Sequence, residues 1–347
     1  MNSKLNLSCK INQIMGKFTL DKWVKSILLA LAAVAAVAHA ADSTPVISGK
    51  NDWLFTSYEF ANASDVRDTE ATIQLLQKVN RLFERQGIAL LLVLVPSKIR
   101  IHSDQLPDYK PLDEYTTGKY ENVFKALRDG GVNVANLNQA FLTSKHRASA
   151  TPLFLRLDTH WSPTGALLAA ETVKSTIETS PVLKLALEAT PEVKYALTWA
   201  KRKVNHRARD LVDLLPKDAP NFASEQILVF TATRVQSTQA SLLGKGDVIG
   251  ITAIGSSYTD EKTGYPDGLR HSLQRDLLDI SIPVTQGPWV GMETYLRDDA
   301  FKKNKPKLII WEIPEREMRA PPNYKFREAR YISDNNEWLS RISGLLK

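Results

Sequence analysis

The sequence predicts an α/β fold in which helices flank a mostly parallel β-sheet. Three nearly continuous apolar runs, at Ile88–Val95, Asp247–Ile254 and Lys307–Ile313, are typical of strands that are covered on both faces. Between these runs, apolar residues recur at the spacing of helices. Helices that alternate with buried strands favour a parallel sheet with helices on its faces.

The first half of the chain contains two predicted helix–strand units. Four apolar residues at helical spacing mark the first helix: Ile73, Leu76, Val79 and Phe83. Gly87 ends this helix before the strand at Ile88–Val95. The second helix is marked in the same way by Tyr120, Val123, Phe124 and Leu127. Gly130-Gly131 ends it before a short predicted strand at Val132–Leu137.

The second half of the chain continues the pattern. Ser162 predicts a helix start, because Ser is a favoured N-cap and Pro163 suits the first helical position. The face of this helix that we expect to be buried carries Ala166, Ala170, Val173 and Ile177. After the strand at Asp247–Ile254, another helix is predicted from its leucines: Leu269, Leu273 and Leu277. Lys307–Ile313 is the last strong strand.

The segment from about Ser180 to Gly246 fits this alternation least well. It contains one β-rich stretch, Gln226–Val235. It also contains a basic cluster: Lys201, Arg202, Lys203, Arg207 and Arg209. We interpret the segment as an insertion or edge element before the strand at Asp247–Ile254, and not as a second domain. A solvated face and a binding surface are both open interpretations of the basic cluster.

The first 40 residues have the pattern of a secretory signal peptide. A positively charged stretch comes first, with Lys17, Lys22 and Lys25. A 12-residue apolar run from Ile27 to Ala38 follows, and Ala38-His39-Ala40 has the small residues that signal peptidase reads. The run is short for a membrane span, which needs about 20 apolar residues. We therefore expect a cleaved signal peptide at 1–40 and an exported domain at 41–347, with an uncleaved inner-membrane anchor as the alternative.

Composition limits the chemistry of the exported domain. The whole chain has 45 Lys and Arg against 38 Asp and Glu, but residues 1–40 hold five Lys and one Asp, so their removal lowers the net charge from +7 to about +3. That balance indicates no nucleic-acid partner. Cys9, the single Cys, leaves with the same segment, which excludes a thiolate nucleophile and a thiolate zinc site. The remaining histidines are scattered without ligand spacing, so we expect no metal and no bound cofactor.

Asp158-Thr159-His160-Trp161, directly before the helix capped by Ser162, can carry chemistry. Residues i and i+2 of an extended segment point the same way, so Asp158 and His160 can face one site. A carboxylate beside an imidazole orients it as a general base. The alternative is a structural pair that ties a loop to the start of a helix.

Gly255-Ser256-Ser257-Tyr258-Thr259 follows the strand at Asp247–Ile254 and is the second candidate. Small and hydroxyl residues at this position allow a sharp turn that presents an oxygen nucleophile at the edge where parallel sheets place their sites. Backbone N–H groups of such a turn can hold an oxyanion. The alternative is an ordinary Ser-rich turn. Together the two segments offer a nucleophile, a base and an orienter.

These motifs resemble those of the SGNH/GDSL hydrolase superfamily and, within it, the AlgJ/AlgX-type alginate O-acetyltransferases. The resemblance covers nearly the whole exported domain. Its most specific part is the block D-x-H-W-[ST]-P-x-G-A at Asp158–Ala166, beside the G-[DTS]-S pattern at Gly255–Ser257. The opening G-x-x-G-W-L-F matches residues 49–55 with Asp52 in place of the second Gly, V-P-x-K matches 95–98, and W-E-x-P-E-R matches 311–316.

The resemblance implies an SGNH hydrolase-like fold with Ser257 as nucleophile, His160 as general base and Asp158 as its orienter. Ser256 stands where relatives have Thr or Asp, which leaves Ser256 as the alternative nucleophile. Tyr258 after Ser257 fits the family and favours Ser257. The chain is more similar to the AlgJ branch, because no C-terminal carbohydrate-binding module is apparent.

Several other residues are candidates for substrate contact. These candidates are Tyr258, Trp161, Arg156, Lys98, Trp289 and Arg316. Trp161, Trp289 and Trp311 can stack on sugar rings or pack in the core. Arg156 and Lys98 can bind an anionic sugar or remain solvated, and Arg316 can form a structural pair with Glu315. Gly287-Pro288-Trp289 is a candidate oxyanion loop.

The resemblance implies a periplasmic enzyme that O-acetylates an exopolysaccharide, alginate above all, through an acyl-serine. It implies an anionic or neutral polysaccharide substrate, a membrane-bound acyltransferase that delivers the acetyl group, and other polysaccharide biosynthesis and export proteins as partners. Two alternatives remain open at this point. One is an esterase with the same Ser-His-Asp triad, and the other is a non-catalytic polysaccharide-binding component of an export complex.

Cleavage of the signal peptide after Ala40 predicts Ala41 as the mature N-terminus, because Ala38-His39-Ala40 ends the apolar run. Mass spectrometry of the N-terminal peptide from a periplasmic extract measures this directly. An intact N-terminus recovered from the inner-membrane fraction would show a signal anchor instead.

Overall fold

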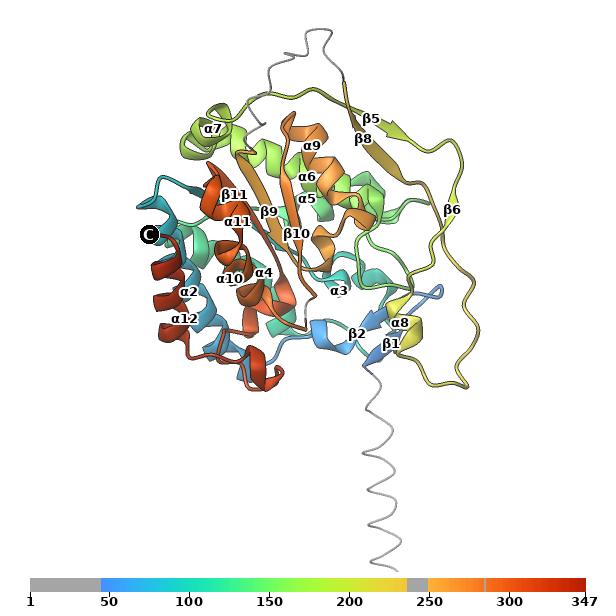
Figure 1. Ribbon diagram of the computed structural model, residues 1–347. Helices are drawn as coiled ribbons and strands as arrows, with labels where there is room; N and C mark the ends of the chain where they lie inside the picture. Colours follow the sequence, from blue (N-terminus) through green and yellow to red (C-terminus); the bar gives the residue numbers. More distant parts are fainter. Residues whose placement is uncertain (1–44, 236–248, 284) are drawn as a thin grey trace, which may run out of the picture. The chain divides into compact units, whose positions relative to one another are not determined.

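Five parallel strands form the central sheet, in the order β10-β9-β11-β3-β4 (Figure 1). The computed structural model describes residues 45–235, 249–283 and 285–347. The strands are β3 (Ala89–Val95), β4 (Asn133–Ala135), β9 (Ile251–Gly255), β10 (Leu278–Ser281) and β11 (Leu308–Pro314). The predicted signal peptide and the start of the predicted strand at Asp247–Ile254 lie outside the described residues. Among the described residues, no helix is both long and apolar enough to span a bilayer.

The apolar runs form the middle of the sheet because both of its faces are covered. Every residue of β11 is buried, and β11 pairs with β3 along its whole length, from Leu308 opposite Ala89 to Pro314 opposite Val95. On its other side, β11 pairs with β9 from Leu308 to Trp311. The fold class and the three strong strands are therefore confirmed. The strand predicted at 132–137 is shorter, because Asn136 caps the next helix by accepting a hydrogen bond from Gln139 N.

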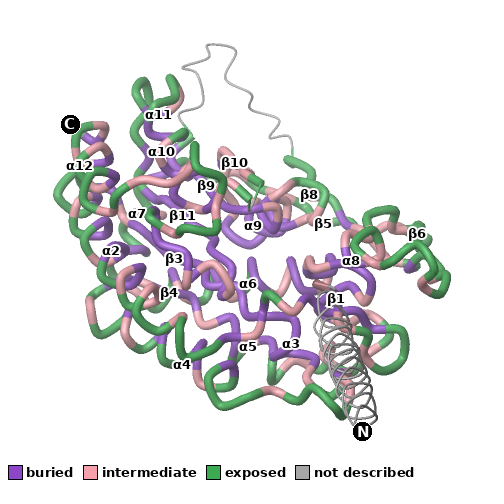
Figure 2. The backbone as a smooth tube through the Cα atoms, turned by 90° about the horizontal axis from the view of Figure 1, so that it is seen from below, coloured by how far each residue is buried: buried purple, intermediate pink, exposed green. Residues whose placement is uncertain are grey.

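Two layers of helices cover the sheet. One hydrophobic cluster joins α5 (Leu137–Thr143), α6 (Pro163–Thr179), α7 (Pro181–Glu188) and α9 (Tyr265–Leu273) to one face. A second cluster joins α2 (Val66–Glu84), α4 (Glu114–Asp129), α10 (Pro288–Arg297), α11 (Asp299–Lys303) and α12 (Asn335–Leu345) to the other face. Alternate residues of β3 enter the two clusters, Leu91 the first and Leu92 the second, as the pleat of a strand requires. Figure 2 shows β3 and β11 as buried strands between the two layers of helices.

The predicted insertion is confirmed as an edge element outside the central sheet. Within it, β5 (Tyr195–Trp199) pairs with β8 (Phe230–Arg234), and β6 (Val204–Asn205) pairs with β7 (Gln226–Ile227), both antiparallel. It also carries the short helix α8 (Asp210–Asp213). The irregular part begins after α7 rather than at Ser180. Lys201, Arg202, Lys203 and Arg207 of the basic cluster are exposed, whereas Arg209 is partly buried and donates to Phe222 O.

The remaining elements are short. They are the antiparallel pair β1 (Val46–Ser48) and β2 (Leu54–Thr56), the helix α3 (Lys98–Ile101), and the 3-10 helices η1 (Ser57–Glu59), η2 (Ala63–Asp65), η3 (Ser103–Gln105), η4 (Lys145–Ala148), η5 (Ser257–Thr259), η6 (Glu261–Thr263), η7 (Glu315–Arg319) and η8 (Ala329–Tyr331). The helix predicted through Leu277 is too long. It ends at Leu273, because Gln274 adopts a left-handed conformation with φ of 52°. The apolar pattern of the sequence did not predict β10, α10 or α12.

The start of α6 explains one glycine of the D-x-H-W block. Ser162 caps the helix by accepting a hydrogen bond from Gly165 N at 3.2 Å, as predicted. A Cβ atom on Gly165 would lie 2.1 Å from Leu153 O, in the loop that runs toward His160. Only glycine therefore lets α6 pack against that loop.

Gly165→Ala should lower the free energy of unfolding by about 1–3 kcal/mol, because the added methyl group forces backbone apart. Gly344→Ala is the matched control. Gly344 lies in α12 with nothing within 4 Å of a Cβ atom, so alanine there should not destabilise the protein. Urea unfolding of both variants measures the difference. Equal stabilities of the two variants would contradict this account of Gly165.

Candidate active site

Ser257, His160 and Asp158 lie in line at the carboxyl end of β9. Ser257 Oγ is 2.7 Å from His160 Nε2, and His160 Nδ1 is 2.6 Å from Asp158 Oδ1. Ser257 and His160 are 97 residues apart in the chain, so tertiary structure brings the two predicted segments together. The three side chains form a hydrogen-bonded Asp–His–Ser triad, an arrangement that can activate a serine hydroxyl.

The turn after β9 presents Ser257. Ser256 caps the 3-10 helix η5, which makes Ser257 its first residue, and the Ser256 hydroxyl accepts a hydrogen bond from Tyr258 N. The side chain of Ser256 therefore points back into the turn, whereas Ser257 Oγ faces His160. The backbone N–H of Ser257 donates no hydrogen bond to any of the residues that the structure describes. That N–H is available to an oxyanion on an acylating group.

Asp158 is buried and holds its negative charge. Its carboxylate accepts hydrogen bonds from the His160 backbone N–H at 3.0 Å and from His160 Nδ1, and Asp210 N lies 3.3 Å from Oδ2. Burial raises the pKa of Asp158, but the hydrogen bonds and charge of His160 outweigh it and lower this pKa to about 2. Asp158 is therefore ionised at neutral pH, as an orienter of His160 must be.

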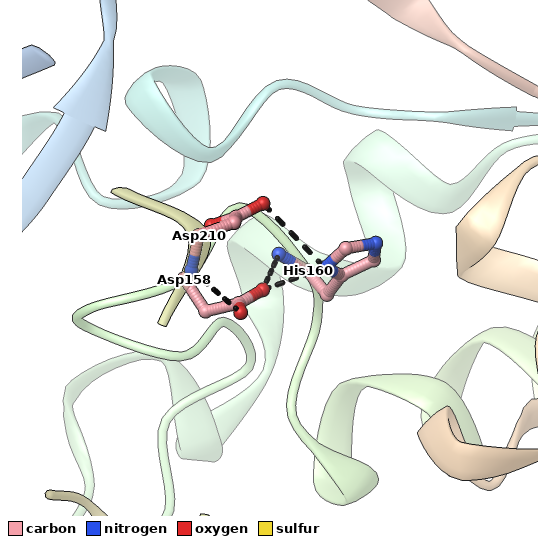
Figure 3. A group of neighbouring side chains, drawn as sticks. All are labelled: Asp158, His160 and Asp210. Carbon is pink, nitrogen blue, oxygen red and sulfur yellow. Dashed lines mark hydrogen bonds and ion pairs between the residues drawn. The ribbon is translucent and has the colours of Figure 1, made fainter. Parts of the chain in front are cut away.

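Asp210 of α8 is a residue near the site that sequence reasoning missed. Its Oδ1 accepts a hydrogen bond from Thr159 N at 2.8 Å, and its Oδ2 lies 3.9 Å from His160 Nδ1 (Figure 3). Asp210 lies in the irregular insertion, where no motif surrounds it. It acts on the site by holding the loop between Asp158 and His160.

Asp158, His160 and Asp210 also form a possible metal-binding group, because one ligand atom from each lies within 4.8 Å of the others. Hydrogen bonds already occupy these atoms, however. His160 Nδ1 faces Asp158 Oδ1 at 2.6 Å, and both carboxylates accept backbone N–H groups. A nitrogen that donates to a carboxylate cannot at the same time ligate a metal. The donor set therefore fits an oriented imidazole better than a metal centre.

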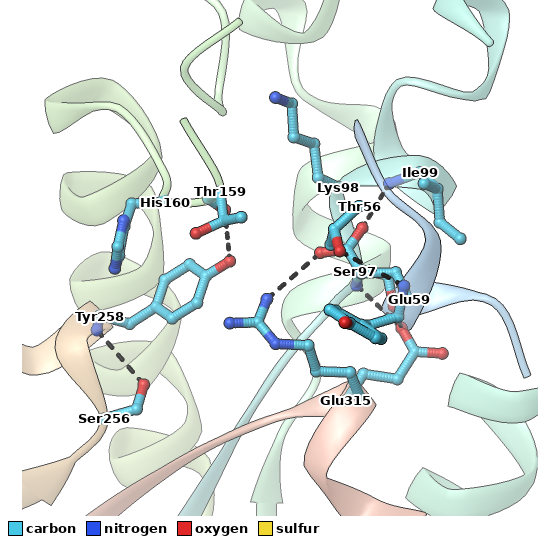
Figure 4. A network of polar contacts seen from close by, with 12 residues as sticks. Thr56, Glu59, Ser97, Lys98, Ile99, Thr159, His160, Ser256, Tyr258 and Glu315 are labelled. Atoms are coloured by element: carbon cyan, nitrogen blue, oxygen red, sulfur yellow. Dashed lines mark hydrogen bonds and ion pairs between the residues drawn. The ribbon is translucent and has the colours of Figure 1, made fainter. Parts of the chain in front are cut away.

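A buried polar network supports the triad (Figure 4). The hydroxyl of Tyr258 donates to Thr159 O at 2.6 Å, which ties the nucleophile turn to the His160 loop. Arg316 lies 5.8 Å from the centre of the Tyr258 ring, and its Nη1 is 3.4 Å from Glu59 Oε1. Burial raises the pKa of Glu59, and the positive charge of Arg316 lowers it by a smaller amount. The Tyr258 ring also packs against the His160 ring, with 5.0 Å between their centres, so Tyr258 supports the triad from the buried side.

Lys98 has a structural role, which corrects its predicted contact with an anionic sugar. Its side chain is buried, and Nζ donates to the backbone oxygens of Leu54, Arg156 and Asp158 at 2.6, 2.9 and 3.0 Å. Burial lowers the pKa of Lys98 to about 8. Lys98 therefore ties β2 to the loop that carries Asp158, and a polysaccharide does not reach it.

Burial also excludes the sugar contacts that we predicted for four aromatic residues. Trp161 packs against Tyr258 and Tyr265, and Trp289 packs against Trp311 and Trp338 while its Nε1 donates to Ala320 O. Tyr258, Trp161, Trp289 and Trp311 are all at most 3 % exposed, so none of them is free to stack on a sugar. The predicted Arg316–Glu315 pair is wrong as well, since Glu315 pairs with Arg100 at 2.6 Å and Arg316 faces Glu59.

Two cavities meet at Ser257 and His160. The larger, of about 760 Å³, is lined by Arg316, Arg319, Tyr58 and Phe326 among others. Tyr58 and Phe326 are 59 % and 88 % exposed, so their rings are free for contact. The smaller cavity, of about 150 Å³, reaches His206 and Lys262. Arg156 lines a neighbouring cavity of about 460 Å³.

The sequence signals for these lining residues were weak. Tyr58 and Phe326 carry no motif, and only their exposure in the folded chain distinguishes them from core aromatic residues. Thr285, two residues before Gly287, also lines the larger cavity. The predicted oxyanion loop itself lines neither cavity at Ser257, because Gly287 and Pro288 lie at the start of α10 and Trp289 is buried.

Comparisons with known proteins agree with this geometry. Residues 46–315 match the family model described as an SGNH hydrolase-like domain of acetyltransferase AlgX. A protein of Pseudomonas syringae pv. tomato named "Probable alginate O-acetylase AlgJ" is 30 % identical over 83 % of this chain and 73 % of its own length. Its namesake in Pseudomonas aeruginosa is 27 % identical, over 78 % and 70 %. The solved O-acetyltransferase domain of Pseudomonas putida AlgJ has a TM-score of 0.70 at 23 % identity and covers 86 % of this chain and 98 % of that domain.

Asp158→Asn should reduce the acyl-transfer rate of each folded molecule by orders of magnitude, because Asn cannot stabilise a charged His160; the same exchange in a serine protease costs about 10⁴. The folded pKa of Asp158, about 2, lies below its ordinary value of 3.8. The stability that the carboxylate adds is therefore present above about pH 4 and lost as pH falls toward 2. Thermal midpoints at pH 7 and at lower pH, with turnover at pH 7, measure both effects.

Asp210→Asn is the matched control, since Asp210 lies farther from His160 Nδ1 and is partly exposed. It should keep most of the rate. A structural Asp158–His160 pair would instead give a less stable Asp158→Asn variant with normal turnover per folded molecule.

Proposed function

Because this chain belongs to the AlgX family of SGNH hydrolase-like acetyltransferase domains, we propose that it O-acetylates hydroxyl groups of an exopolysaccharide through an acyl-serine on Ser257. The observation that carries the proposal is the relay from Asp158 through His160 to Ser257, with hydrogen bonds of 2.6 and 2.7 Å. The name alginate O-acetylase of its relatives supports alginate as the acceptor polymer.

The first half-reaction forms the acyl-enzyme. His160 Nε2 accepts the hydroxyl proton of Ser257 while Oγ attacks the carbonyl carbon of an acetyl donor. The negative charge that develops on the carbonyl oxygen is held by the backbone N–H of Ser257. The leaving group of the donor departs with the proton from His160, and the acetyl group remains as an ester on Ser257.

The second half-reaction transfers the acetyl group to the polymer. A sugar hydroxyl enters beside His160, which accepts its proton while the sugar oxygen attacks the acetyl carbon. Ser257 Oγ leaves and takes the proton back from His160, so the enzyme is restored. Asp158 holds the Nδ1–H of His160 throughout and stabilises the imidazolium formed in each step.

The larger cavity suits a polysaccharide acceptor. Exposed Tyr58 and Phe326 offer ring faces to the apolar faces of sugars. Arg316 and Arg319 line the same cavity, but they pair with Glu59 and Asp65, and Asp210, Glu317 and Glu328 line it as well. The wall therefore carries charges of both signs, and the support for alginate comes from the names of the relatives. Arg156 lines the 460 Å³ cavity, which shares Leu155, Pro163 and Ile227 with the smaller cavity at Ser257 and offers further surface to a long chain. These contacts replace the tryptophans that the sequence suggested.

The enzyme acts in the periplasm in this proposal, as the apolar run at 27–38 supports. A membrane-bound acyltransferase would then deliver the acetyl group, and other polysaccharide biosynthesis and export proteins would handle the polymer. The relatives named for alginate biosynthesis support a role within that machinery.

Incubation with an activated acetyl ester should add one acetyl group to the peptide that contains Ser257, and added alginate oligosaccharide should then receive it. Ser257→Ala should abolish both steps. Ser256→Ala is the matched control and should retain substantial activity, because the Ser256 hydroxyl faces away from His160. Mass spectrometry of the protein and of the oligosaccharide reads both outcomes.

Acetate release without any acetylated oligosaccharide would indicate an esterase. Oligosaccharide binding without an acyl-serine would indicate a binding component. An adduct on Ser256, or equal loss in both variants, would overturn the assignment of Ser257.

A further inference from the structure

Glu312 lies directly behind the nucleophile turn. It is a residue of β11, next to the last pair between β11 and β9, and it is 1 % exposed. Its Oε2 accepts hydrogen bonds from Ser256 N at 2.7 Å, Ser256 Oγ at 2.9 Å and Thr259 Oγ1 at 3.1 Å. One carboxylate thus holds the residues on both sides of the segment that carries Ser257.

The fit around this carboxylate is tight. A Cβ atom on Gly255 would lie 2.3 Å from Glu312 Oε2 and 2.1 Å from Thr259 Oγ1. Glycine at 255 therefore allows Glu312 to reach the turn. On the other face of the turn, Ser256 O accepts hydrogen bonds from Thr259 N at 2.9 Å and from Ser281 Oγ at 3.0 Å. The N–H, carbonyl and hydroxyl of Ser256 are all engaged.

Glu315, the first residue after β11, makes the corresponding contact with the turn after β3, on the other side of β11. Glu315 Oε2 accepts hydrogen bonds from Ser97 N at 2.8 Å and Ser97 Oγ at 2.7 Å, in the turn after β3. Arg100 neutralises Glu315, with Nη2 at 2.6 Å from Oε1. The two glutamates thus share their geometry, but only Glu312 contacts the turn that carries the nucleophile.

Glu312 lacks the cation that Glu315 has. Among the described residues it forms no ion pair within 4.0 Å. Burial raises its pKa to about 7, although the hydrogen bonds that it accepts and the more distant charge of Arg316 lower it. A buried carboxylate without a paired cation is a costly way to stabilise a fold. Such groups are more typical of functional sites.

We propose that Glu312 is a positioning residue for acyl transfer: it fixes the turn that aims Ser257 at His160, and it keeps the hydroxyl of Ser256 engaged. This inference rests on the proposed function, since it assigns a role within the same site. Glu312 touches neither substrate nor the reacting atoms. It acts through the backbone of Ser256, and misplacement of a reacting group by about 1 Å can cost about 100-fold in rate.

The test is the burst of p-nitrophenol from p-nitrophenyl acetate, which reports acetylation of Ser257. Glu312→Ala should slow the burst by about 100-fold with little change in KM. Glu312→Gln should stay within about tenfold of the wild type, because its amide oxygen can accept Ser256 N and its NH₂ can donate to a hydroxyl. Glu312→Asp keeps the charge but is too short to reach Ser256 N, and should lose at least tenfold even where Glu312→Ala fails to fold.

Glu315→Gln is the matched control at the equivalent contact on Ser97. It should lower the thermal midpoint, because Arg100 loses its charged partner, yet keep the burst rate of each folded molecule. Wild-type burst rates in folded Glu312→Ala and Glu312→Asp would overturn the inference. Equal slowing in Glu315→Gln and the Glu312 variants would also overturn it, by showing a general structural effect. Absence of any p-nitrophenol release by the wild type would instead contradict the proposed function.

Discussion

The site depends on two carboxylates at the carboxyl end of β11. They accept hydrogen bonds from the turns that follow the neighbouring strands, β9 and β3. β11 lies between β9 and β3, so Glu312 and Glu315 reach the turns that follow those strands. Each carboxylate holds a serine through both its N–H and its hydroxyl. Buried N–H groups at the ends of strands need acceptors, and these glutamates supply them while they fix the directions in which two loops leave the sheet.

The His160 side of the site depends on a buried cation in the same way. Lys98 follows β3 and binds the backbone oxygens of Leu54, Arg156 and Asp158. An ammonium group has three protons and no acceptor, so three carbonyls satisfy it completely. The loop that carries Asp158 and His160 is thereby joined to the N-terminal strand pair. The triad forms where the loop held by Lys98 meets the turn held by Glu312.

Several motif residues therefore build the site rather than bind substrate. Lys98, Trp161 and Trp289 were candidates for sugar contact because cations and tryptophans often bind sugars, but each is buried with its partners. The sequence does not show whether an aromatic side chain is buried or exposed, because the same ring can pack in a core or bind a sugar. Tyr58 and Phe326 are the exposed aromatic residues of the larger cavity that Ser257 also lines, although no sequence pattern distinguishes them.

The sequence alone was enough to predict β3, β4, β9 and β11, the helices α2, α4, α6 and α9, and the two segments that meet in the site, because apolar runs, a Ser-Pro cap and two short motifs are local signals. Burial on both faces makes a strand visible as a continuous apolar run, as in β3 and β11. The folded structure was needed to show that β10 lies at the edge of the sheet, that Ser257 Oγ faces His160 while Ser256 Oγ binds Glu312, that Asp210 supports the loop, and which charges pair. These outcomes depend on contacts between segments far apart in the chain, such as Glu312 with Ser256, and no local pattern records such distances.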